Sequence, residues 1–164
     1  MGERRTGGAR LIQVDRQLVR ADPARVFACA RDVERWPEWL PHYRWVRFLE
    51  RQGDGGVVEM AAWRPFGPLN WPTWWVSEMR VEPSPPAVRY RHVRGITRGM
   101  DVEWAFAPAP GGTAVTLTHR WRGPAWPLVG PPAASLVIGP IFIHGIAQLT
   151  LAGIARVAER GGEA

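Results

Sequence analysis

The sequence contains no lysine, and all 21 of its basic residues are arginine. Chemistry that needs a lysine amine, such as a Schiff base with a carbonyl substrate, is therefore excluded. The arginines are spread along the chain, with local density only at residues 3–5 and 89–98. The net charge of +6 consequently does not form the basic stripe that is typical of nucleic-acid binding, and we expect no nucleic-acid partner.

Cysteine is almost absent as well. The single Cys29 excludes an internal disulfide and any multi-cysteine metal site. It lies among small and apolar residues, which predicts a buried and unreactive thiol. The four histidines do not stand at ligand spacing with carboxylates, so no metal site is predicted. The sequence also lacks a phosphate-binding glycine loop and a nucleophile–histidine–carboxylate motif, and we expect no cofactor.

No apolar run is long enough to cross a membrane. Residues 125–154 carry no formally charged side chain, but Pro127, Pro131, Pro132 and Pro140 divide this stretch. The pieces are shorter than the roughly 20 residues that a spanning helix needs. The N-terminus lacks the apolar core of a signal peptide. We therefore expect a cytoplasmic protein without an integral membrane segment.

Tryptophan, in contrast, is abundant. The chain has ten tryptophans, and three of them lie within Trp71–Trp75. Indole is large, and its N–H requires a hydrogen-bond partner when it is buried. Such a cluster is compatible with a packed core, a membrane-facing surface or the wall of a pocket for a flat apolar molecule.

Hydrophobic periodicity predicts an α+β fold. A first strand covers residues 11–20, and Asp22 followed by Pro23 is typical of the start of a helix, which ends near Asp32. The proline-broken segment 34–42 is predicted to be a turn or a very short second helix. Six further strands in three hairpins are predicted at 45–51, 57–64, 71–82, 87–94, 99–107 and 113–122. A long helix follows at 139–159, with an apolar face predicted at Phe142, Gly145, Leu149 and Ala152.

Seven antiparallel strands need an element to cover their apolar face, and only the C-terminal helix is long enough. The predicted architecture is a helix-grip: a curved seven-stranded antiparallel sheet wrapped around that helix, with two short helices after the first strand. The length suits a single ligand-binding domain at residues 10–160. We expect a disordered tail at 1–9 and a flexible C-terminus at 161–164. The space between sheet and helix can be core or cavity.

Four short segments carry a family resemblance. They are LVRADPARVF at 18–27, DVERWPEWLP at 32–41, WAFAP at 104–108 and GGTAVTL at 111–117. Together with the order of the elements, they resemble the START-like (SRPBCC) helix-grip superfamily, in particular its coenzyme Q-binding and polyketide cyclase/dehydrase branch. The resemblance covers about residues 10–160. It implies that the partner is a small hydrophobic molecule such as a quinone, a polyketide or a lipid.

Alternation along the predicted strands separates a charged outer row from an apolar inner row. Trp74 falls in the outer row. Many inward indoles packed on one helix leave gaps that a flat guest ring would fill by offset stacking; the alternative is a filled core. The predicted ligand-binding residues are Trp63, Trp71, Trp75, Ser77, Met79, Tyr90, Met100, Trp104, Phe106 and Trp121, with His144 and Gln148 added from the helix. For these last two, helix packing is the alternative.

Three inward polar residues are candidates for catalysis. Arg64 ends an otherwise apolar face and would hold a carbonyl, enolate or carboxylate oxygen, or else it caps the strand and reaches solvent. His92 and His119 lie on strands that flank one common strand, where they would transfer protons or act as ordinary core histidines. In the aromatase/cyclase relatives a cavity arginine assists ring closure. The resemblance gives this part to Arg64, supported by Tyr43 or Tyr90.

Three functions remain open. The first is a binding module for a mostly apolar, ring-containing molecule. The second is a polyketide aromatase/cyclase or dehydratase, in which arginine stabilises an enolate and histidine or tyrosine moves protons. The third is a surface formed by Trp36, Trp39 and Trp74 that binds a partner or transiently contacts a membrane. Catalysis requires the arginine and histidines to meet around one open volume. No oligomeric state follows from the sequence.

Overall fold

The computed structural model describes residues 11–66, 68–122 and 139–161. Its strands are β1 Leu11–Val19, β2 Tyr43–Gln52, β3 Gly55–Phe66, β4 Leu69–Pro83, β5 Pro86–Gly95, β6 Asp101–Ala109 and β7 Gly112–Trp121. Its helices are α1 Pro23–Arg31, the 3-10 turn η1 Val33–Arg35, α2 Trp36–Trp39 and α4 Gly139–Arg160. The predicted tail at 1–9 and the last residues, 162–164, lie outside the described residues.

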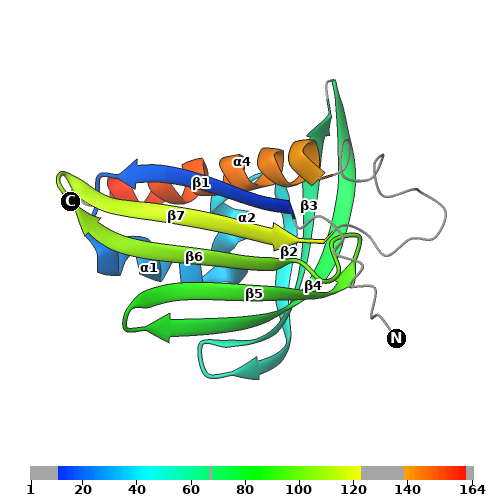
Figure 1. Ribbon diagram of the computed structural model, residues 1–164, viewed down its shortest axis with the longest axis horizontal. Helices are drawn as coiled ribbons and strands as arrows, with labels where there is room; N and C mark the ends of the chain where they lie inside the picture. The colour runs from blue at the N-terminus through cyan, green and yellow to red at the C-terminus, as the bar shows by residue number, and fades with distance from the viewer. Residues whose placement is uncertain (1–10, 67, 123–138, 162–164) are drawn as a thin grey trace, which may run out of the picture.

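The seven strands form one antiparallel sheet in the order β1-β7-β6-β5-β4-β3-β2. Only the β1–β7 pair joins strands that are distant in sequence, so the sheet is a meander to which the first strand is added at one edge. The curved sheet has α1, α2 and α4 on the same side (Figure 1). The predicted α+β helix-grip fold, including its seven strands and long C-terminal helix, is confirmed.

The start of α1 follows the predicted chemistry. The Asp22 carboxylate accepts a hydrogen bond of 2.8 Å from the Ala24 N–H, and Pro23 occupies the first helical position, where no N–H is needed. Val26 and Phe27 on this helix are buried against the sheet. Cys29 is half-buried, and this burial raises the pKa of its thiol, in keeping with an unreactive cysteine.

The buried face of α4 differs from the prediction. Leu149 is 40% exposed, and the side chains that pack into the core are Ala147, Leu151, Ile154, Ala155 and Ala158. The helix is apolar on most of its circumference, so sequence periodicity could not select one face. Gly153 lies against α2: a Cβ at this position would stand 2.0 Å from Leu40 Cδ2, so the missing side chain permits the close approach.

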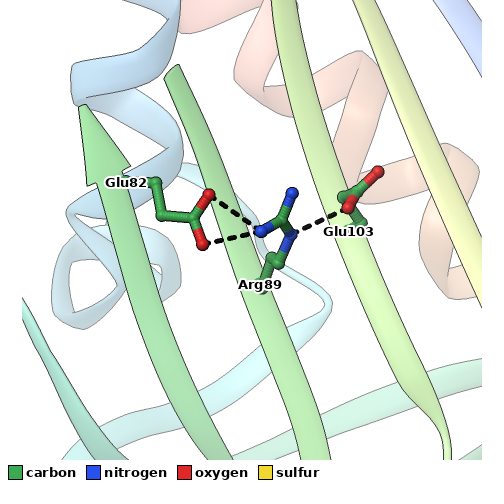
Figure 2. A network of polar contacts seen from close by, with 3 residues as sticks. All are labelled: Glu82, Arg89 and Glu103. Carbon is green, nitrogen blue, oxygen red and sulfur yellow. Dashed lines mark hydrogen bonds and ion pairs between the residues drawn. The ribbon is translucent and has the colours of Figure 1, made fainter. Parts of the chain in front are cut away.

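Charged side chains cover the outer face of the sheet, as alternation predicted. Arg89 lies between two carboxylates: its Nη1 donates to both oxygens of Glu82 at 2.6 and 2.8 Å, and its Nε donates to Glu103 at 2.8 Å (Figure 2). Arg89 and Glu103 are directly opposite in the β5–β6 register. Exposed pairs of this kind contribute little stability each. They mark the solvent face, and the apolar core lies on the other side of the sheet.

Candidate functional site

A cavity of about 80 Å³ lies between the inner face of the sheet and α4. A buried water occupies roughly 10–15 Å³ of such space, so the cavity exceeds the size of one water. Its wall is mostly aromatic and apolar. The lining residues are Trp36, Tyr43, Met60, Trp75, Tyr90, His92, Thr97, Met100, Val102, Trp104, Leu117, His119, Ile146, Ala147 and Thr150.

Aromatic rings in contact with one another form one side of the cavity. The rings of Trp75 and His92 are stacked, with centroids 5.8 Å apart and planes 8° from parallel. Trp36 packs edge-on against Tyr43 at 5.2 Å and lies 6.0 Å from Trp104. These contacts hold the rings in fixed orientations, and a planar apolar group entering the cavity would meet preformed ring faces.

The two predicted histidines reach the same cavity from different strands. His92 on β5 and His119 on β7 are separated by β6, and both are buried. Desolvation lowers the pKa of His92 to about 3 and that of His119 to about 4. Both rings are therefore neutral at physiological pH. His92 Nδ1 lies 2.6 Å from the hydroxyl of Thr97, which fixes the orientation of the ring.

Two polar atoms in the cavity wall have no hydrogen-bond partner among the described residues. They are the hydroxyl of Tyr90 and Nδ1 of His119. In the sheet register, Tyr90 is opposite Val102 and Val102 is opposite His119, so the three side chains form a row across β5, β6 and β7. The apolar side chain of Val102 therefore lies between the polar groups of Tyr90 and His119. Burial raises the pKa of Tyr90 well above its usual range, so its hydroxyl keeps the proton and can donate it in a hydrogen bond.

Thr150 brings α4 into the polar part of the site. Its hydroxyl donates to the backbone carbonyl of Ile146 at 2.8 Å, and His42 Nε2 lies 2.9 Å from the Thr150 hydroxyl oxygen. The hydroxyl of Tyr43 is 3.4 Å away. Desolvation lowers the pKa of His42 to about 4, so this histidine is also neutral at physiological pH. The network ties the helix to the start of β2 beside the cavity.

Arg64 is buried on β3, and this burial lowers the pKa of its guanidinium, yet Arg64 does not line the cavity. It lies toward the end of the β3–β4 hairpin, directly opposite Trp71. The predicted meeting of Arg64 with His92 and His119 around this volume is therefore not observed. The histidines meet Tyr90 there instead.

The predicted ligand-binding and catalytic residues fall into three groups. The first group lines the cavity: Trp75, Tyr90, His92, Met100, Trp104 and His119. The second is buried without contributing to the cavity wall: Arg64, Ser77, Met79, Phe106 and Trp121. The third is exposed: Trp63, Trp71, His144 and Gln148. Six of the fifteen predicted residues therefore line one cavity.

The exposed tryptophans correct the sequence prediction. Trp71 follows the inward alternation of β4 but is 62% exposed, because alternation fixes the face of a side chain and not whether another element covers that face. Trp63 lies on the outer face, where the Arg44 guanidinium is 4.5 Å from its ring. Trp36, predicted as part of an exposed patch with Trp39 and Trp74, is instead 2% exposed and lines the cavity.

The helix residues predicted for the site are also corrected. His144 is exposed and lies 3.0 Å from Gln13 Nε2 and 3.2 Å from Asp15 Oδ1 of β1. Gln148, four residues later, is exposed on the same flank. The helix wall of the cavity consists of Ile146, Ala147 and Thr150. Because the buried face of α4 differs from the predicted one, His144 and Gln148 lie outside the cavity wall.

Trp74, on the outer face of β4, has a structural role. Its indole N–H donates a hydrogen bond of 2.9 Å to Glu59, a buried carboxylate that also accepts from Arg47. The hydrogen bond from Trp74, followed by the contacts with Arg47, lowers the pKa of Glu59 despite its burial. The Trp74 indole therefore stabilises the Glu59 carboxylate on the outer face of the sheet, and it does not line the cavity.

Within the described residues, no group of histidine, cysteine, aspartate and glutamate side chains is arranged to hold a metal ion. In the same part of the chain, no helix has the length and apolar character needed to cross a bilayer. Of the uncharged stretch 125–154, residues 125–138 lie outside the described residues.

The sheet, its order and the cavity under α4 define an α+β helix-grip fold. The family model "Polyketide cyclase / dehydrase and lipid transport" matches residues 19–138. This match covers more than half of the chain, and the chain belongs to that family. No curated protein sequence matches this chain.

Solved structures show the same fold. Zhui aromatase/cyclase from Streptomyces sp. R1128 has a TM-score of 0.79 at 19% identity, over 93% of this chain and 95% of that chain. The di-domain ARO/CYC BexL from the BE-7585A biosynthetic pathway has a TM-score of 0.73 at 18% identity, over 94% of this chain and 52% of that chain. A START superfamily protein from Mycobacterium smegmatis has a TM-score of 0.64 at 15% identity, over 92% and 96%. At these identities the likeness shows the fold alone.

Proposed function

We propose that the protein binds a small, mostly apolar molecule with a single substituted ring in the cavity under α4. The observation that carries this proposal is the cavity wall, which combines ordered ring faces with two buried polar atoms that have no partner among the described residues. Burying apolar area contributes about 25 cal/mol per Å². A volume of about 80 Å³ favours one ring over a fused ring system.

The polar atoms specify what the ring carries. A buried polar group without a partner costs about 1–3 kcal/mol, so a ligand that pairs with Tyr90 and His119 gains from removing that cost. The Tyr90 hydroxyl is a donor, which selects a carbonyl or hydroxyl oxygen on the ligand. The neutral His119 ring accepts or donates according to its tautomer. A ring that packs on Val102 and carries an oxygen at each end would form hydrogen bonds with both Tyr90 and His119.

A second candidate is an aromatase/cyclase activity, in line with the family description and with the printed names of two structural neighbours. It is favoured by the presence of two neutral histidines and a protonated tyrosine in one cavity. A histidine would remove a proton from the carbon beside a carbonyl, and the Tyr90 hydroxyl would stabilise the enolate oxygen. However, a base with a pKa of about 4 is weaker than the near-neutral value that suits proton abstraction. We therefore place binding first.

Organic extraction of the purified protein followed by mass spectrometry tests for a retained compound. Calorimetry with two probes tests the polar contacts: 4-hydroxyacetophenone has an oxygen at each end of one ring, and ethylbenzene has none. We expect the oxygenated probe to bind more tightly. Tyr90→Phe should reduce its affinity by up to about tenfold and leave that of ethylbenzene unchanged.

A blank extract together with no binding of either probe would contradict the proposal. Conversion of a β-polyketone by the purified protein, abolished in His119→Asn or His92→Asn while 4-hydroxyacetophenone still binds, would favour the cyclase.

A further inference from the structure

The end of the β3–β4 hairpin exposes large apolar side chains. Leu69 is 66% exposed and Trp71 is 62% exposed, while Trp63 and Trp74 are each 37% exposed. We call these four residues the hairpin patch. The hairpin extends beyond the neighbouring strands at the upper right of Figure 1. Single exposed apolar residues are ordinary on a protein surface, but several gathered at one projecting end indicate an interaction site.

The hairpin patch occupies both faces of the hairpin. The β3–β4 register puts Leu69 and Trp71 on one face and Trp63 and Trp74 on the other. A folded protein partner packs on one face of such a ribbon, whereas the interfacial layer of a bilayer surrounds the end of a hairpin that enters it. Tryptophan is also the side chain that favours this layer, because its ring is apolar and its N–H is polar.

The charges beside the hairpin patch are positive. Residues 60–77 include one arginine and no acidic residue. On the outer face, the Arg44 guanidinium lies 4.5 Å from the ring of Trp63, and that of Arg94 lies 5.9 Å from the ring of Trp74. Glu59, which Trp74 contacts, is 9% exposed and is paired with Arg47. Guanidinium groups next to exposed indoles complement the phosphates of anionic lipids.

We propose that the hairpin patch inserts into the surface of bilayers that contain anionic lipids. Leu69 and Trp71 enter the interfacial layer, and Arg44 and Arg94 lie beside the headgroup phosphates. The net charge of +6 adds a longer-range attraction that salt screens. The contact is peripheral, and it makes no use of the cavity or of any ligand.

Co-sedimentation with vesicles tests this proposal, using phosphatidylcholine alone and phosphatidylcholine mixed with phosphatidylglycerol. We expect binding to the mixed vesicles, with weaker binding at high salt. The double variant Leu69→Ser/Trp71→Ser should bind at least about tenfold more weakly, and Arg44→Gln about fivefold more weakly. Leu49→Ser is the matched control: Leu49 is 47% exposed on β2, toward the opposite end of β3, and its loss should leave binding unchanged.

All variants replace exposed residues, and circular dichroism and thermal melting establish that they are folded. Absence of binding to the mixed vesicles overturns the proposal, as does equal binding by the double variant and the wild type. A wild-type dimer in size-exclusion chromatography that the double variant converts to a monomer would assign the hairpin patch to a second copy of the chain, and would also overturn it. The extraction and calorimetry experiments are unaffected by these outcomes.

Discussion

His92 and His119 are neutral because the cavity wall withdraws both rings from water. At the scale of single residues, this burial decides between two kinds of chemistry. A neutral imidazole pairs well with a ligand hydroxyl or carbonyl, whereas a strongly lowered pKa weakens it as a proton acceptor. A ligand that brings an anionic oxygen to either ring would raise the pKa of that ring. Binding and proton transfer are therefore linked at these two positions.

Buried neutral histidines make the stability depend on pH. Between the ordinary histidine pKa of 6.5 and the lowered values of about 4 for His42 and His119 and about 3 for His92, the unfolded chain binds protons that the folded protein does not. The free energy of unfolding should therefore fall as the pH decreases through this window, by about 1.4 kcal/mol per pH unit for each such histidine once the pH is well below 6.5. Urea unfolding at several pH values between 6.5 and 4.5 measures the slope.

His119→Asn provides the comparison for this measurement. It removes one of the titrating groups and should reduce the slope by about 1.4 kcal/mol per pH unit in the same window. Leu49→Ser, at an exposed position on β2, removes no titratable group and should leave the slope unchanged. A wild-type free energy of unfolding that does not change with pH in this window would show that the buried rings are already protonated or solvated in the folded protein.

At the scale of elements, period-two alternation predicted the strands well because each strand has one covered and one solvated face. Val88, Tyr90 and His92 are buried, and Arg89 and Arg91 between them are exposed. The same rule misplaced Trp71, since a strand can continue past the element that covers it. For α4, nearly continuous apolar character left the phase undetermined, and the buried face was wrong. Local patterns give the type and sidedness of an element, while coverage depends on tertiary packing.

Two glycines of α4 test how closely the helix packs on α2. Gly153→Ala places a Cβ against the fully buried Leu40 and should destabilise the protein by about 1–2 kcal/mol, because overpacking exceeds the gain in helix propensity. Gly145→Ala, with nothing within 4 Å of the added Cβ, should stabilise it by about 0.5–1 kcal/mol. Thermal or urea unfolding measures both. Equal effects of the two substitutions would mean that Leu40 moves freely and that the contact does not limit the approach of the helix.

At the scale of the whole molecule, the candidate site arises where the sheet curves over the helix. The sequence could place His92 and His119 near one another because sheet order and alternation fix their relation. It could not show that Trp36, from the short α2, joins the wall, or that Ala147 and Thr150 are the helix residues that face it. Those positions depend on how the sheet, α2 and α4 pack together. The same limitation applies to Arg64, whose strand continues past the cavity toward the hairpin end.

The cavity itself predicts opposite effects for two alanines on the same face of α4. Ala147 lines the cavity, whereas Ala155 is buried in packed core away from it. Ala147→Leu fills open volume of about 80 Å³ and should stabilise the ligand-free protein by about 1–2 kcal/mol, using about 24 cal/mol per Å³ as the upper limit. The added side chain should also prevent binding of 4-hydroxyacetophenone.

Ala155→Leu adds the same atoms in the buried core outside the cavity wall and should cost about 1–3 kcal/mol. Urea unfolding and calorimetry of both variants give the stability and the affinity. If both substitutions destabilised the protein to the same degree, the space under α4 would be packed core in solution, and the ring-binding proposal would lose its basis. Opposite signs, with loss of probe binding only in Ala147→Leu, would locate the binding volume between α4 and the aromatic wall of the sheet.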